Sequence, residues 1–232
     1  MWSRIVLVPE SPGFGDPASH KPMIEIPAGP DAAVAICHLQ LRMQTPGGIY
    51  CDWQAGERSM LCDTTFANDN RTQSLNWRIS GAGGGFFENL WNPGASGDGL
   101  EITSTGRTWL YSVQQEHYPG TALILRGAKH VRALGLQFEA SSRYVLIDQC
   151  EDVRLYQTIA GNWGQQVPSL LHVVGSRGIL LVNSALCRAD AVITEKPHGW
   201  TAGPRSNDRG FARYTAWVAS DKEARPEGGA PP

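Results

Sequence analysis

The sequence predicts an all-β fold, a right-handed, single-stranded parallel β-helix whose coils of about 22 residues stack on one another. Short strand-like runs recur in pairs, and turn clusters of similar length separate them. The strand cores also recur at a fixed step, because Trp109, Val131 and Val153 are each 22 residues apart. No window carries the sustained i, i+3, i+4, i+7 apolar pattern of a helix. These three observations together favour a solenoid.

The repeated unit consists of two apolar runs joined by a turn. The same step extends back to Phe87 and, after an insertion at 162–166, forward to Ile179. The paired runs are LEI with TWLYSV, ALIL with VRALGLQF, YVLI with VRLYQ, and LLHVV with GILLVNS. An antiparallel sandwich would also contain many short strands, but it has no reason to repeat in register. The periodicity therefore decides between the two folds.

We expect three parts along the chain. Residues 1–20 are a lead-in with a possible strand at 6–8, and residues 21–218 are the β-helix domain. Within that domain, the turn-rich and polar segment 45–71 is predicted to leave the coil as a long loop excursion. Residues 219–232 are polar and rich in proline, which is typical of a disordered tail.

The composition limits the classes of partner. The chain has 232 residues and a formal net charge of −2, so no basic surface predicts a nucleic-acid or membrane partner. No apolar run approaches the ~18 residues that a membrane span needs. The start, MWSRIVLVPESPG, lacks the apolar core of a signal peptide. Localisation therefore stays open, with secretion expected if the chain is a fragment or mature form of an exported protein.

Five cysteines leave at least one thiol unpaired. Cys51 and Cys62 are close enough in sequence to close a small loop, and the sequence leaves that pairing open. Cys150 and Cys187 lie in or beside strand-like runs, which favours buried free thiols. No CxxC motif and no cysteine and histidine spacing predicts a metal site, so no cofactor is expected.

Two glutamates occupy similar places in successive repeats. Glu116 lies seven residues after Trp109, and Glu139 lies eight after Val131. With one residue of slippage they emerge at the same corner of neighbouring coils, roughly 5 to 10 Å apart. Two carboxylates at that separation suit glycoside hydrolysis, in which one acts as the acid. The competing interpretation is a solvated edge of the solenoid.

Hydrogen-bonding groups and an aromatic residue accompany this pair and predict a sugar-binding site. The polar candidates for substrate contact are Gln114, Gln115, Gln137, His117 and Tyr118. Trp163, on the insertion one coil further on, is a candidate for stacking against a sugar ring. His117 as a surface imidazole and Trp163 as a loop anchor are the alternatives of comparable weight.

The runs GFFENLW, STGRTWLYSVQQEH and ALILRGAKHVRALGLQFE resemble the C-terminal β-helix of glycoside hydrolase family 55. These are the β-1,3-glucanases, or laminarinases, of the pectin-lyase-like superfamily. The family pattern has an EN-W motif, then ST-G--WLYG---EH, then a Q-E motif. The matching residues here are Glu88, Asn89, Trp91, Ser104 to Tyr111, Glu116, His117, Gln137 and Glu139. The resemblance covers about residues 75–140.

The resemblance implies an inverting hydrolase acting on β-1,3-glucan without a metal or cofactor. It implies that Glu139 is the general acid and that Glu116 belongs to the same site. Members of the family are built from two tandem β-helices with the cleft between them. A second β-helix domain or chain is therefore an expected partner, together with a polysaccharide or oligosaccharide substrate.

Two other functions remain open from the sequence. The first is a non-catalytic β-helix that binds a polysaccharide or a partner protein. The second is a polysaccharide lyase, which commonly needs a calcium-binding acidic cluster. Asp148, Glu151 and Asp152 form the only dense acidic group in the repeats, and their place in a turn favours simple solvation.

Overall fold

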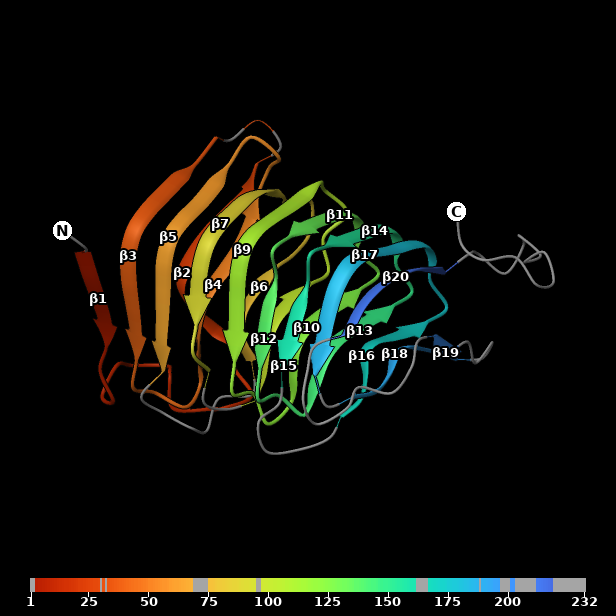
Figure 1. Cartoon of the computed structure of the whole chain (residues 1–232). Helices are drawn as coiled ribbons and strands as arrows, with labels where there is room; N and C mark the ends of the chain where they lie inside the picture. Colours follow the sequence, from red (N-terminus) through yellow and green to blue (C-terminus); the bar gives the residue numbers. More distant parts are fainter. Residues whose placement is uncertain are drawn as a thin grey trace.

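The computed structural model describes residues 3–29, 31, 33–68, 75–94, 97–161, 167–187, 189–196, 201–202 and 212–218. Over these residues the chain contains strands and no helix, so the described part includes no helix that could cross a membrane. Parallel strands about 24 residues apart stack into a β-solenoid of about six turns. Figure 1 shows the coils following one another from β1 to the C-terminal strands. The predicted parallel β-helix is confirmed.

Two sheets form the walls of the solenoid. The 11-stranded sheet, which we call sheet A, contains β1 (Ser3–Leu7), β3 (Ala35–Met43), β5 (Met60–Asn68), β7 (Gly85–Asn92), β9 (Thr108–Glu116), β11 (Lys129–Leu134), β12 (Gln137–Glu139), β14 (Glu151–Tyr156), β15 (Ile159–Gly161), β17 (Arg177–Cys187) and β20 (Ala212–Val218). The nine-stranded sheet, sheet B, contains β2 (Lys21–Gly29), β4 (Gly48–Ala55), β6 (Leu75–Ile79), β8 (Asp98–Ile102), β10 (Thr121–Arg126), β13 (Arg143–Asp148), β16 (Val167–Val174), β18 (Ala189–Lys196) and β19 (Thr201–Ala202).

Apolar side chains in register fill the interior. Along sheet B, one inward column runs through Trp53, Ile79, Ile102, Leu125, Ile147 and Val173. Along sheet A, the facing column runs through Phe87, Leu110, Ala133, Leu155 and Leu181. All of these side chains are buried. Because a strand alternates its side chains between two faces, each coil buries its apolar half only against its neighbours.

The first coils carry an aromatic core. Phe66 and Trp77 stack with ring centroids 5.2 Å apart, and Trp77 contacts Phe87 at 5.9 Å. The buried Trp53 donates its indole N–H to the carbonyl oxygen of Gly84 at 2.9 Å. Trp53 and Trp77 are therefore structural, whereas Trp91 and Trp109, among the described residues, reach the surface.

A column of left-handed residues bends sheet A at the same place in seven successive coils. The residues with positive φ are His38, Asp63, Asn89, Ser112, Gly135, Gln157 and Asn183. These are mostly types that tolerate this backbone region. A side-chain hydrogen bond also connects two neighbouring residues of this column, because Asn89 Nδ2 donates to Asp63 Oδ1 at 2.6 Å. We call the part of sheet A before the bend the first limb and the part after it the second limb.

The strand register corrects two anchors of the predicted repeat, Trp109 and Phe87. Phe87 pairs with Leu110, so it is not in the column of Val131. Val131 pairs with Val153, as the spacing predicted, but its partner on β9 is Thr108. Trp109 pairs instead with Arg132. The step from β9 to β11 is thus one residue longer than the step from β11 to β14. Trp109 consequently lies on the outer face, where the predicted register had placed a core residue.

The predicted excursion at 45–71 is wrong for most of its length. This segment contains β4 and β5, which pair in parallel with β2 and β3 and continue the solenoid. Residues 69–74 lie outside the described part of the chain. In the lead-in, β1 pairs with β3 and so adds a strand to sheet A.

The C-terminal end departs from parallel pairing. β20 pairs antiparallel with β17, and β19 pairs antiparallel with β18. Such strands cover the last parallel edges, which would otherwise be open to other chains. The predicted tail at 219–232 lies outside the described residues.

The disulfide joins Cys37 to Cys62, not Cys51 to Cys62. Cys37 and Cys62 are direct partners in the register of β3 and β5, which brings their Cα atoms to 4.6 Å. Cys51 lies on β4 in the other sheet, where burial raises the pKa of its thiol to about 12. Cys150 is a buried free thiol as predicted, whereas the side chain of Cys187 lies outside the described part.

We expect replacement of Cys37 and Cys62 by serine to lower the free energy of unfolding by about 2–4 kcal/mol, because the bridge closes a 25-residue loop. Urea unfolding of the parent and the double variant measures the difference. A reductant should destabilise the parent to the level of the variant and leave the variant unchanged. A variant as stable as the oxidised parent would contradict this.

Acid should weaken a network of ion pairs around Asp152. Partial burial alone would raise the pKa of this carboxyl, but hydrogen bonds from Arg132 and His130 and the charges of Arg132 and Arg154 outweigh it and lower the pKa to about 2. A lowered pKa stabilises the fold above the ordinary value near 3.8, and this contribution disappears as the pH falls from about 4 to 2.

Asp152→Asn should therefore lower the stability at pH 7 by about 1 kcal/mol and flatten its decline below pH 4. Thermal unfolding across pH 2–7 measures both effects. Asp148→Asn is the control, since that carboxylate lies 3.8 Å from one arginine, Arg126. An identical acid profile for Asp152→Asn and the parent would refute the assignment.

Candidate functional site: a carboxylate pair on adjacent coils

The two glutamates are direct neighbours across two coils. In the parallel pairing of β9 with β12, Glu116 is the Cα partner of Glu139, and Gln114 is the partner of Gln137. Paired strands are ~4.8 Å apart, so the two carboxylates leave the backbone at adjacent positions. The expectation that both emerge at the same corner of neighbouring coils is confirmed.

The chain turns in the same way after each glutamate. His117 and Ala140 both adopt left-handed backbone conformations, with φ of 59° and 49°. The backbone N–H of His117 donates to the carbonyl of Glu139 at 2.7 Å, and that of Ala140 to Gly161 at 3.0 Å. These hydrogen bonds continue the ladder past the last strand residue. They hold both carboxylates at a fixed corner.

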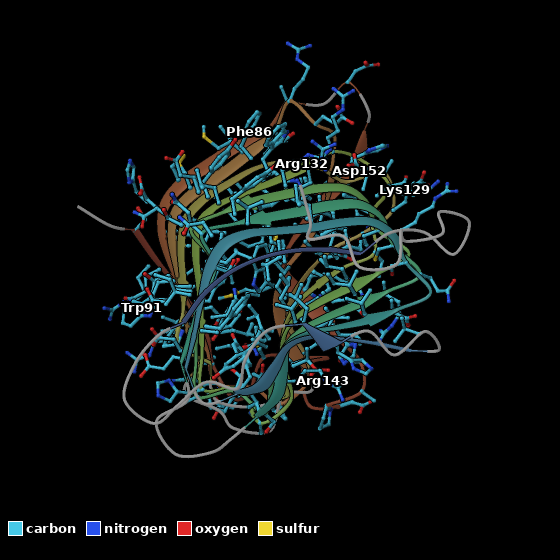
Figure 2. All side chains as sticks on the ribbon, turned by 45° about the vertical axis from the view of Figure 1, so that its right-hand side comes forward. Phe86, Trp91, Lys129, Arg132, Arg143 and Asp152 are labelled. Atoms are coloured by element: carbon cyan, nitrogen blue, oxygen red, sulfur yellow. A yellow bond between two sulfur atoms is a disulfide. The ribbon has the colours of Figure 1, made fainter. Side chains whose placement is uncertain are left out.

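The outer face of the second limb surrounds the pair with polar groups and one exposed indole. Trp91 pairs with Gln114, and Gln114 with Gln137, so these side chains form a row next to the glutamates. Trp91 is 46% exposed. We call the surface made by Trp91, Gln114, Glu116, Gln137 and Glu139 the carboxylate face. Figure 2 shows Trp91 on a different flank of the solenoid from Phe86 and Arg132.

Glu116 is enclosed and held by its neighbours. Its side chain is only 10% exposed. The amide of Gln114 donates to Oε1, and His117 Nδ1 lies 3.8 Å from Oε2. These contacts fix the orientation of the Glu116 carboxylate.

Glu139 has a different environment. It is partly exposed, and among the described residues its carboxylate has no hydrogen bond or ion pair. Its backbone carbonyl, in contrast, accepts from His117 and from the hydroxyl of Ser141 at 3.2 Å. The side chain can therefore exchange a proton with a molecule that arrives from solvent. Two adjacent carboxylates with unequal surroundings suit unequal roles.

Gln115 and Tyr118 do not fit the predicted role in substrate contact. Strand alternation turns Gln115 inward, and both residues are 1% exposed. Gly99 packs next to the Gln115 amide and Gly94 next to the Tyr118 ring, where a methyl group would come within 3 Å of either. Burial raises the pKa of Tyr118 well above its ordinary value. These residues support the corner from inside.

The remaining predicted residues divide as follows. His117 and Gln137 are exposed beside the pair, in keeping with substrate contact. Trp163 lies outside the described residues. The sequence interpretation gave Trp91 no binding role. The signal that could have found it is the 23-residue step from Trp91 to Gln114, which matches the step from Gln114 to Gln137.

The acidic group lies at the end of β13 and the start of β14, not in the turn as predicted, and its carboxylates are paired with basic side chains. Arg177 Nη2 lies 2.6 Å from the carboxylate of Glu151, and His130 Nδ1 lies 2.9 Å from that of Asp152. Lys129 adds a second contact to Glu151 at 3.4 Å. These carboxylates are ion-paired, not simply solvated as predicted. Within the described ranges, no cluster of three or more histidine, cysteine or acidic side chains could hold a metal ion.

Comparison with known proteins adds no relative. No family model matches the chain, and a search of curated proteins finds no match.

Replacing Gln115 by leucine should leave the stability unchanged or raise it by about 1 kcal/mol. Neither polar atom of this buried amide has a hydrogen-bond partner in the described structure, so leucine removes an unsatisfied group of similar size. Urea unfolding measures the difference. Leu110→Ala, an inward residue of the same strand, is the contrasting control and should cost about 2–5 kcal/mol. A comparable loss for Gln115→Leu would contradict the prediction.

Proposed function

We propose that this β-helix protein is an inverting glycoside hydrolase acting on β-1,3-glucan, or one half of such an enzyme. The observation that carries the proposal is the direct pairing of Glu116 with Glu139 on adjacent coils. The resemblance of residues 75–140 to glycoside hydrolase family 55 supplies the expected substrate. The exposed Trp91 offers an apolar surface for a sugar ring next to the pair.

The two environments support a division of roles. Glu139, with a carboxyl group reachable from solvent, protonates the oxygen of the leaving sugar as general acid. Glu116, whose carboxylate is oriented by the Gln114 amide, stabilises positive charge that develops on the reacting sugar ring. Gln137 and His117 are placed to donate hydrogen bonds to sugar hydroxyls. These roles are filled by side chains of the carboxylate face and by His117 beside it.

An inverting reaction also needs a water held on the opposite side of the sugar ring by a general base. A base that faces Glu139 across a bound sugar must stand above the carboxylate face and not on it, because inversion places the two groups on opposite sides of the scissile bond. We propose that a second β-helix domain or chain supplies this group and completes the cleft.

The central test is Glu139→Gln, which should reduce laminarin hydrolysis by at least about 100-fold because the amide cannot donate the proton. Release of reducing sugar measures the rate. Proton NMR of the first product should show the α-anomer from the β-linked substrate, as inversion requires. Activity of Glu139→Gln equal to the parent would remove the assignment of the acid. If the parent chain is inactive by itself, the same two rates are compared after the second β-helix domain or chain has been supplied.

Two glutamine variants distinguish an outward residue of the carboxylate face from a buried residue that supports it. Gln114→Leu should lower the rate, because Glu116 loses its amide donor. Gln115→Leu should retain the parental rate, since the adjacent residue points into the core. Equal losses in both variants would indicate general disruption of the strand and not a role at the carboxylates.

A non-catalytic glycan-binding β-helix is the second candidate, and one observation favours it. Large apolar side chains are exposed on both limbs of sheet A, including Phe86, Trp91 and Leu134. A surface of this kind marks a binding region even where no reaction occurs. Binding of glucan without product, equally strong in the parent and in Glu139→Gln, would select this candidate over the hydrolase.

A further inference from the structure

A groove crosses the outer face of the first limb, away from the carboxylate pair. It has a volume of about 440 Å³ and crosses β9, β11, β14 and β17. Four paired strands span about 14 Å. The bend at Ser112 and Gly135 lies between this groove and the carboxylate face. The groove is therefore not part of the site already described.

The groove exists because neighbouring coils carry side chains of different height. Trp109 and Tyr111 on β9 form one wall, and Tyr156 on β14 contributes to the other. Between them, β11 presents only Leu134 and the side of Arg132. Leu134 is 41% exposed, so the floor of the groove is open to solvent.

Arg132 is held aside by the ion-pair network. Its guanidinium donates to the backbone carbonyl of Asp152 at 2.7 Å and to the carboxylate of the same residue. Figure 2 shows Arg132 and Asp152 close together on the flank that also carries Phe86. Arg132 is the one charged residue among those that line the groove, and its charge is already paired. The groove therefore suits a neutral ligand.

The aromatic wall has a geometry that suits a flat ligand. The rings of Trp109 and Tyr111 are parallel within 3°, with centroids 6.3 Å apart. The ring of Phe86 is parallel to both, within 9° and 8°. Because these rings are parallel, a flat ligand can pack against more than one of them in the same orientation. At the other side of the groove, the polar side chains of Gln157 and Asn183 form a rim at the bend.

We propose that this groove binds a neutral oligosaccharide chain as a site separate from the carboxylate face. A pyranose ring has apolar C–H faces and a rim of hydroxyl groups, which match aromatic walls beside a polar edge. A charged glycan would find no unpaired opposite charge among the residues that line this groove. The proposal does not depend on hydrolysis at Glu139, because the bend separates the two surfaces.

The test is binding of laminarin and of a soluble β-glucan by isothermal titration calorimetry, in the Glu139→Gln background so that no substrate is consumed. Leu134→Lys, at an exposed position, fills the groove without removing a packed side chain and should weaken binding at least about 10-fold. Trp109→Ala should weaken it by a similar factor. Circular dichroism and thermal unfolding confirm that each variant is folded.

Val6→Lys is the matched control. Val6 is an equally exposed aliphatic residue, but it lies on β1 at the other end of sheet A, away from both the groove and the carboxylate face, so its replacement should leave glycan binding unchanged. The proposal is overturned if no glycan binds, or if Leu134→Lys and Trp109→Ala bind as tightly as the parent. Self-association abolished by Leu134→Lys without glycan binding would overturn it as well. If the parent protein binds glycan in the groove but does not hydrolyse it, the proposal for the groove stands and only the proposed enzyme function is removed.

Discussion

The parallel register between successive coils is the constraint on which the other features of this protein depend. Backbone hydrogen bonds fix which residue of one coil stands next to which residue of the next, and they repeat about every 24 residues. Once Val131 is paired with Val153, the residues on either side of both follow with no further freedom. A shift by one residue would exchange inner and outer faces along the whole strand. Core, disulfide and candidate site are consequences of the same pairing.

The bend in sheet A gives one sheet two chemical surfaces. Strands such as β9 pass through the left-handed column at Ser112 and contribute to both limbs. On the first limb β9 presents Trp109 and Tyr111 to the neutral groove, and on the second limb it presents Glu116 to the carboxylate face. A single nine-residue strand therefore carries both candidate sites. Their relative position is set by the pairing of β9 with β7 on one side and with β11 and β12 on the other.

Polar residues at equivalent positions stabilise the stacking from outside. On sheet B, the buried carboxylate of Asp52 accepts from Arg78 at 2.6 Å and from the Ser80 hydroxyl at 2.8 Å. On sheet A, Asp152 connects Arg132 of the preceding coil with Arg154 of its own strand. These ion-paired carboxylates therefore connect neighbouring coils. The glutamates of the carboxylate face differ because Glu139 has no such cation among the described residues.

The sequence by itself determined the fold class and the near alignment of Glu116 with Glu139, because a repeat leaves its period in the order of apolar residues. It did not determine the register at Trp109, where a step of 23 residues replaces one of 22 and moves a tryptophan from core to surface. Only the tertiary structure separated Gln114 from Gln115, outward and buried respectively, and paired Cys62 with Cys37. For Trp109 and the two glutamines the physical reason is that one residue of slippage, invisible in a pattern of apolar runs, decides which side of a strand a side chain faces. For the cysteines it is that Cys51 and Cys62 lie in different sheets, whereas Cys37 and Cys62 are partners on adjacent strands.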